Sequence, residues 1–280
     1  DNTQAVLSEL QSSTDETGTA KIQVSSKDLI TTVVTAQLEG GNALKTPSLT
    51  FTADVSTAKV TTISSEKQQV VANNNDTDTV TAQVTDNYNH PLSGVTVNWT
   101  VEKTDDTPVA TKTSTTDSSG NAVLALKSSK TGTITVSAEV KGTSPQETDP
   151  IAFVADASTQ TVSEITLSKQ KAVANGSDSI TYEATVTDAQ GNTVAGATVN
   201  WSADNSDAKL SAAQTTSDSR GVSQITVTSL KAGAVIVSAG TSSTAMKQAG
   251  SATFTADSSS ATVTSLTSDR QSALANGTDG

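Results

Sequence analysis

The chain repeats itself with a period of about 100 residues. Its two tryptophans, Trp99 and Trp201, lie 102 positions apart in the matching segments GVTVNWT (94–100) and GATVNWS (196–202). The three phenylalanines recur at nearly the same interval, in FTAD, FVAD and FTAD: Phe51, Phe153 and Phe254. A unit of this length can hold its own hydrophobic core, whereas the short repeats of a solenoid share one. The sequence therefore predicts a row of separate domains.

The phase of the repeat divides the chain into four parts. Two complete units cover residues 55–156 and 157–257. Residues 1–54 match the second half of a unit, and residues 258–280 match the start of a further one. We expect the two partial units to remain separate, because together they would still lack the tryptophan segment.

Each unit has the pattern of an all-β fold. Short runs rich in Val, Thr and Ile alternate apolar with polar residues, and Gly, Asn, Asp and Ser separate them. Seven or so such strands in about 100 residues are typical of an immunoglobulin-like β-sandwich. In TVNW, alternation places Val97 with Trp99, and Val199 with Trp201, on one face of the strand. The predicted core residues are the large aromatic ones: Trp99, Trp201, Phe51, Phe153 and Phe254.

The segments between units are short. Residues 55–59, 157–161 and 258–262 contain neither proline nor glycine, so they lack the composition of a flexible tether. We expect limited bending and tandem sandwiches arranged as an extended rod. At roughly 35 to 45 Å per sandwich, the rod would be about 100 to 120 Å long.

Composition excludes several functions. A net charge of −12 argues against nucleic acid and against electrostatic binding to anionic lipid. The chain has no cysteine, and its single histidine, His90, lies in a turn and is replaced by Asn192 in the next unit. A catalytic triad or a zinc site needs more than this. We expect no enzymatic activity and no cofactor.

Calcium is the one metal for which the sequence offers candidates. Oxygen ligands cluster in NNNDTD (73–78) and NGSDS (175–179), and an aspartate ends each unit. The candidate ligands are Asp54, Asp76, Asp78, Asp156, Asp178 and Asp257. None lies in a D-x-D-x-D-G loop, and Asp, Asn and Ser also form turns by bonding their own backbone. The sequence favours the turn interpretation over a metal site.

The repeats resemble the bacterial Ig-like domains, group 1, of the intimin and invasin family of inverse autotransporters. The resemblance rests on VTDNYNHPLSGVTVNWT (84–100) with TTDSSGNAVLAL (115–126), and on VTDAQGNTVAGATVNWS (186–202) with TSDSRGVSQITV (216–227). It implies a stalk of tandem domains on the bacterial surface, anchored in the outer membrane through a separate barrel domain. An adhesive tip outside this sequence would bind a host-cell or bacterial surface receptor.

Three functional classes follow. In the first, the chain is a spacer in an adhesin that serves cell adhesion or biofilm formation. In the second, it is a binding module whose own repeats engage a host protein, a glycan or a neighbouring bacterium. In the third, it is an accessory array of a polysaccharide-degrading enzyme. Glycan arrays stack sugars on exposed aromatic rings. Once the cores take the other aromatics, only Tyr88 and Tyr182 are left for a surface. This scarcity disfavours the third class.

Overall fold

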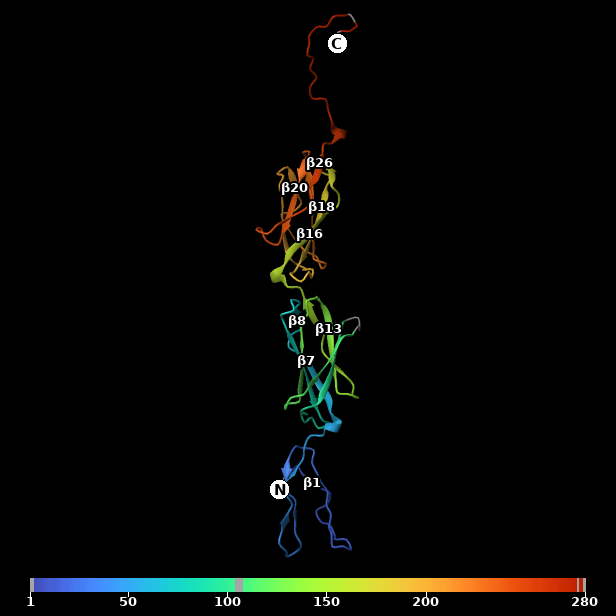
Figure 1. The fold of residues 1–280 in the computed structure, drawn as a ribbon, viewed down its shortest axis with the longest axis vertical. Helices are drawn as coiled ribbons and strands as arrows, with labels where there is room; N and C mark the ends of the chain where they lie inside the picture. Colours follow the sequence, from blue (N-terminus) through green and yellow to red (C-terminus); the bar gives the residue numbers. More distant parts are fainter. Residues whose placement is uncertain (1–2, 104–107, 276, 279–280) are drawn as a thin grey trace. The chain divides into compact units, whose positions relative to one another are not determined.

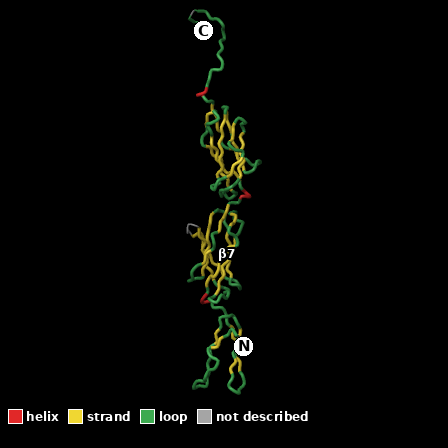
Figure 2. Tube along the Cα trace, turned by 180° about the vertical axis from the view of Figure 1, so that it is seen from behind, coloured by secondary structure: helices red, strands yellow, loops and turns green. Residues whose placement is uncertain are grey.

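The computed structural model describes residues 3–103, 108–275 and 277–278. Within them the regular secondary structure consists of β-strands and three single-turn 3-10 helices, joined by loops and turns (Figures 1 and 2). These helices are Val55–Thr57 (η1), Ala157–Thr159 (η2) and Ser258–Ser260 (η3). The chain forms two compact units, Asp1–Val154 and Ala155–Gly280. The prediction of an all-β fold is confirmed.

The first unit contains a β-sandwich. One sheet has the order β12-β9-β7, formed by Asn121–Leu126 (β12), Asp78–Thr85 (β9) and Lys59–Ser65 (β7). The other has the order β11-β10-β13-β15-β8, and a short strand β14 also pairs with β13. Its strands are Pro108–Thr115 (β11), Thr96–Lys103 (β10), Gly132–Glu139 (β13), Gln146–Glu147 (β14), Ile151–Val154 (β15) and Gln69–Val71 (β8). All pairs are antiparallel except β15 with β8, which are parallel.

The second unit contains a similar sandwich with two differences. Its first sheet has a fourth strand, in the order β16-β18-β22-β20: Thr161–Leu167 (β16), Ile180–Thr187 (β18), Val222–Ser229 (β22) and Ala208–Leu210 (β20). Its opposite layer is split into β21-β19-β24-β25 and β17-β26-β23. These strands are Gln214–Thr216 (β21), Thr198–Ala203 (β19), Val237–Gly240 (β24), Lys247–Gln248 (β25), Lys171–Val173 (β17), Ala252–Thr255 (β26) and Gly233–Val235 (β23). The split arises because the counterpart of β13 is interrupted at Ile236.

Each sandwich is held by its own apolar core of mostly Val, Ala, Leu and Ile, with one tryptophan. Trp99 is 1% exposed and Trp201 is 5% exposed. The ring N–H of Trp99 donates to Ser114 Oγ at 2.8 Å, and that of Trp201 donates to Thr215 Oγ1 at 2.7 Å. Each indole therefore fills apolar space without leaving its polar group unpaired. Other core members are Val97, Val199, Phe153 and Phe254.

Two aromatic residues differ from the sequence prediction. Phe51 is only partly buried and belongs to neither core. Residues 3–54 contain no counterpart of the tryptophan strand, so no opposing sheet covers this ring. Their strands pair only as Val6–Leu7 (β1) with Val24–Ser25 (β2), Thr31–Thr32 (β3) with Leu49–Thr50 (β6), and Thr35–Ala36 (β4) with Leu44–Lys45 (β5). Tyr182, expected on a surface, is fully buried in the second core.

Candidate functional site

The three aspartates that end the repeats all form the same local structure. Asp54, Asp156 and Asp257 each precede a 3-10 helix and act as its N-cap. In each case one carboxylate oxygen accepts hydrogen bonds from the backbone N–H and the hydroxyl of the serine two residues later. An acidic side chain in this position satisfies donors that a helix end would otherwise leave unpaired. These three carboxylates therefore have a structural role.

Two further calcium candidates form ion pairs. Asp76 lies 2.5 Å from Lys67 Nζ and also accepts the backbone N–H of Val71 at 3.0 Å. Asp178 makes the equivalent contacts, with Lys169 and with the N–H of Val173. A lysine ammonium in direct contact with each carboxylate occupies the position that a cation would need.

The sixth candidate, Asp78, is fully buried in the first sandwich. Its carboxylate accepts from Ser65 Oγ at 2.6 Å and from the backbone N–H of Lys67 at 3.0 Å. The second repeat has Ile180 at this place, so the carboxylate is particular to the first. Across the described residues, no three His, Cys, Asp or Glu side chains are grouped so that they could hold a metal ion.

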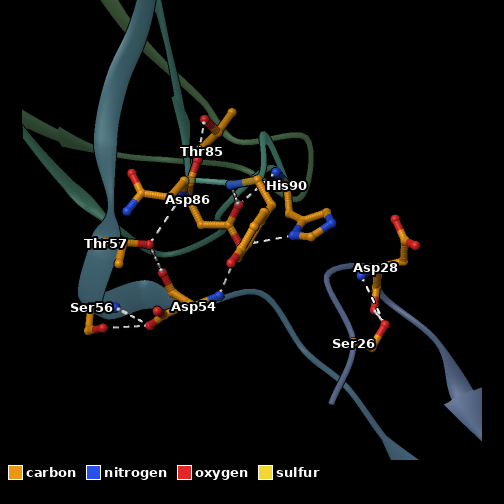
Figure 3. Close-up of polar contacts among 10 residues, drawn as sticks. Ser26, Asp28, Asp54, Ser56, Thr57, Thr85, Asp86 and His90 are labelled. Atoms are coloured by element: carbon orange, nitrogen blue, oxygen red, sulfur yellow. Dashed lines mark hydrogen bonds and ion pairs between the residues drawn. The ribbon is translucent and has the colours of Figure 1, made fainter. Parts of the chain in front are cut away.

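A densely hydrogen-bonded site in the first repeat was not predicted from the sequence. It is centred on Asp86, which is 1% exposed and follows β9 (Figure 3). Asp86 Oδ1 accepts the backbone N–H groups of Tyr88 and His90, at 2.8 and 3.0 Å. Oδ2 accepts the N–H of Asp54 at 3.1 Å and lies 2.9 Å from His90 Nδ1. Because an ionised carboxylate only accepts, we place the proton on Nδ1 of His90.

The second repeat contains the same arrangement around Asp188, which is 4% exposed. Oδ1 accepts the N–H groups of Gln190 and Asn192, and Oδ2 accepts the N–H of Asp156 at 3.0 Å and the amide of Asn192 at 2.9 Å. We call each set, a buried aspartate with the turn that follows it and the N-cap aspartate 32 residues before it, the junction clamp. The clamp fastens the segment through which the chain enters a sandwich to that sandwich's own loop.

A second contact reinforces each clamp. The N–H of Asn87 donates to Thr57 Oγ1 at 3.3 Å, and in the second repeat the N–H of Ala189 donates to Thr159 Oγ1 at 3.1 Å. The threonines belong to η1 and η2, so both the start and the end of each 3-10 helix are tied to the same loop. The entering segment thus has little freedom to move within its unit.

Opposing effects set the pKa of the clamp carboxylates. Burial is the largest single influence and raises the pKa of Asp86, whereas donors from His90, Asp54 and Tyr88 lower it. The donors together prevail and hold the pKa well below its usual value. In Asp188 burial again raises the pKa, and the amide of Asn192 and the N–H of Asp156 outweigh it. Both carboxylates are therefore charged at neutral pH, and their bonds are of the stronger, charge-assisted kind.

A signal for the clamp is present in the sequence. Each complete repeat has a VTD segment, and its aspartate follows the N-cap aspartate by 32 residues: 54 to 86 and 156 to 188. The equivalence of His90 and Asn192, which argues against catalysis, is also part of this signal. Both side chains donate to a carboxylate from the fourth position after it, so either residue completes the turn.

Tyr182 carries an isolated polar group. Its hydroxyl oxygen is buried and has no hydrogen-bond partner in the described part of the chain. Burial, followed by the charge of Asp204, raises the pKa of the phenol. With Tyr182 in the core, Tyr88 is the tyrosine that remains exposed, at 53%. One exposed ring does not make a stacking surface for glycans.

None of the helices in residues 3–103, 108–275 and 277–278 has the length and apolar character needed to cross a membrane.

Comparison with known proteins identifies the relatives of this chain. It is 33% identical over 230 residues to the inverse autotransporter adhesin YeeJ of Escherichia coli (strain K12), a match that covers 81% of the chain and 10% of the adhesin. It is 32% identical over 185 residues to intimin of Citrobacter freundii, covering 64% of the chain and 19% of intimin. The chain thus spans a small part of each relative.

Solved structures agree on the fold. InvD of Yersinia pseudotuberculosis aligns with a TM-score of 0.51 and 21% identity, over 75% of this chain and 62% of InvD. The strongest result concerns the repeats themselves, because residues 60–154 and 162–255, more than half of the chain, match the sequence pattern of one domain family. The chain therefore belongs to the bacterial Ig-like domain (group 1) family, in the form found in intimin and invasin adhesins.

Proposed function

We propose that this chain is a stalk segment of a bacterial surface adhesin, in which tandem Ig-like domains project an adhesive tip from the outer membrane. The junction clamp is the observation that carries the proposal. A spacer must resist bending, and a segment held at both ends of its 3-10 helix by a charged, buried aspartate offers few rotatable bonds that are free to turn. The relatives, an inverse autotransporter adhesin and an intimin, support the adhesin context.

In this proposal affinity lies outside the segment. The receptor, on a host cell or on another bacterium, would meet a tip domain, and a separate domain would anchor the protein in the membrane. The surface of the segment fits a spacer, because an acidic chain with net charge −12 repels its neighbours and stays soluble. Cell adhesion and biofilm formation would follow from the reach of the stalk.

The rigidity of the junction can be measured with spin labels attached to introduced cysteines. The chain contains no cysteine of its own, so only the introduced positions are labelled. Val123→Cys and Gln224→Cys place one spin label on an exposed strand position in each repeat. Pulsed electron paramagnetic resonance should give a narrow distance distribution, and Asp188→Ala should broaden it. Asp207→Ala is the matched control, because this carboxylate pairs with Lys231 at 2.9 Å outside the clamp. A broad distribution in the parent chain would contradict the spacer mechanism.

The alternative function is direct binding by the repeats. It predicts that the purified chain binds saturably to host cells or to bacteria, whereas a spacer predicts none. One surface of the first repeat favours this alternative, and its properties are distinct from those of the clamp.

A further inference from the structure

The first sandwich has an open groove on one flank, with a volume of about 810 Å³. Its apolar floor is formed by residues from both sheets: Val101, Ala125, Leu126, Ile134 and Phe153. Lysines line it from both sides, with Lys103 and Lys112 on β10 and β11, and Lys127 and Lys130 in the loop that follows β12. Four cations around one apolar groove are notable in a chain whose net charge is −12.

The groove exists because one strand follows different paths in the two repeats. In the first, β11 pairs with β10 along its length, from Thr115 opposite Thr96 to Pro108 opposite Glu102. In the second, the corresponding stretch is divided between the two sheets. Its early part, β20, pairs with β22, and its later part, β21, pairs with β19. The strand β20 closes the flank that is open in the first repeat.

The unclosed flank leaves a strand edge available. In the second repeat this edge is covered, because Leu210 pairs with Val227 and Ala208 pairs with Ser229. Beside them, the N–H of Thr226 donates to Ser211 Oγ at 3.0 Å, and the carbonyl oxygen of Thr226 accepts the N–H of Ser211 at 2.9 Å. The first-repeat counterpart of Thr226 is Ala125, on β12. Among the described residues β12 pairs with β9 alone, so its outer edge has no strand beside it. Such an edge is a template for an added strand.

Three of the four charges at the groove are specific to the first repeat, whereas Lys130 corresponds to Lys231. Lys103, Lys112 and Lys127 correspond to Asn205, Ala213 and Thr228 in the second, where β20 occupies the flank. Within the described part of the chain these three lysines form no ion pair with Asp or Glu. The repeat with the open edge is thus the one that carries the positive rim.

We propose that this groove binds an extended acidic segment of another protein by strand addition to β12. The backbone of the bound segment pairs with the edge at Ala125, as β20 pairs with β22 in the second repeat. On the side of the segment that faces the groove, apolar side chains cover Leu126, Ile134 and Phe153, and carboxylates meet Lys103 and Lys112, because Lys112 lies opposite Trp99 on the inward face. Carboxylates on the outward side of the segment meet Lys127, which follows the buried Leu126. Backbone hydrogen bonds then give affinity, and the charges select acidic sequences.

This inference develops the alternative function, direct binding by the repeats, and does not depend on the rigidity of the junctions. Rigid junctions are possible without a ligand at β12, and a ligand can bind at β12 when the junctions are flexible. The spin-label experiment tests the junctions, whereas the experiments below test the groove, so failure of either proposal is recognisable by itself.

The primary test uses the full 280-residue chain and a capped heptapeptide of glutamate with valine or isoleucine, in which glutamate occurs on both faces of the extended chain. In amide nuclear magnetic resonance spectra, the peptide should shift signals of β12 and of the groove but none in the second repeat. In the free protein, the N–H of Ala125 should exchange with solvent faster than that of Thr226, and peptide should slow it. Binding should weaken at least tenfold between about 20 and 200 mM salt, because the rim charges are exposed.

Variants identify the contacts. Lys103→Glu with Lys112→Glu should weaken peptide binding at least tenfold at low salt. The matched control is Lys141→Glu with Lys171→Glu, which makes the same change in net charge at exposed sites outside the groove and should leave binding within twofold. Ala125→Pro removes one donor from the edge and should also abolish binding. Tryptophan fluorescence checks that each variant is folded.

Several results would overturn the proposal. One is that millimolar acidic peptide causes no shifts of β12 signals. Another is that a peptide with lysine in place of glutamate binds as tightly as the acidic peptide. A third is that the control variant loses as much binding as Lys103→Glu with Lys112→Glu. Saturable binding of laurate or of a sulfated oligosaccharide at the groove, without binding of the acidic peptide, would assign it to a different class of ligand. If Ala125→Pro does not fold, the lysine variants and the exchange of Ala125 still decide.

Discussion

Replacement of Asp188 by alanine tests the clamp most directly. The substitution removes the acceptor of four donors, contributed by Asp156, Gln190 and Asn192. Gln190 is exposed and Asp156 is partly so, so water can replace their lost bonds, whereas Asn192 is 6% exposed and loses the acceptor of both its N–H and its amide. Loss of a partner for a buried donor costs about 1 to 3 kcal/mol. We expect Asp188→Ala to lower the free energy of unfolding by about 2 to 4 kcal/mol, a large fraction of a domain's stability.

The assay is urea unfolding of the full chain carrying Trp99→Phe, so that the fluorescence of Trp201 reports on the second sandwich alone. Asp188→Asn keeps an acceptor and should cost less than alanine. Asp207→Ala, at an exposed ion pair, should leave the unfolding midpoint almost unchanged. A loss below about 1 kcal/mol for Asp188→Ala would refute the reasoning, because buried donors then would not depend on the carboxylate.

The same carboxylate makes a prediction about pH. Because the pKa of Asp188 is lower in the folded protein than in the unfolded chain, its contribution to stability is fully present above the unfolded pKa of about 4. That contribution is lost as pH falls from there toward the folded pKa. The parent protein should therefore lose more stability between pH 5 and pH 2.5 than Asp188→Asn does. Parallel pH profiles for the two proteins would contradict the assignment.

Four further outcomes are expected. Trp201→Ala should destabilise the second sandwich by about 3 to 5 kcal/mol in urea unfolding, and an unchanged midpoint would remove the ring from the core. Gly221→Ala should cost clearly more than Gly196→Ala, since both have positive φ but only at Gly221 would a Cβ lie 2.9 Å from the carbonyl oxygen of Val186; equal losses would show that the close approach is unimportant. Tyr182→Phe should be neutral or stabilising, because the buried hydroxyl has no partner in the described structure, so a loss above about 1 kcal/mol would imply one. Calcium should leave the melting temperature unchanged relative to EDTA, because lysines contact Asp76 and Asp178, and a rise of several degrees would restore the metal hypothesis.

The fold was accessible from the sequence because its determinants are local. Alternation of apolar and polar residues decides which face of a strand is buried, and it placed Val97 with Trp99 and Val199 with Trp201 in their cores. Repetition of these strands with turn residues between them then favours one architecture. The prediction that Phe51 is a core residue was wrong, because an apolar residue on a strand is buried only if an opposing sheet is present to cover it.

The functional features depended on contacts between distant residues. The partners of Asp86 and Asp188 include a backbone N–H 32 residues earlier, and no local pattern records which N–H a carboxylate will meet. Tyr182 lies on a strand whose inward face was identifiable, yet only the packed core shows that its hydroxyl lacks a partner.

The open flank of the first repeat is the clearest case. The stretch that forms β11 in one repeat and β20 with β21 in the other has a similar composition in both, and either sheet offers it an edge of hydrogen-bonding groups. Which edge it takes depends on competition between two non-local pairings. The sequence by itself therefore determined the all-β type of the fold and the place of each tryptophan strand in its core, because these follow from short-range periodicity. Tertiary structure alone decided where the chain is clamped and where a sheet edge stays open, because these depend on which distant groups come within hydrogen-bonding distance.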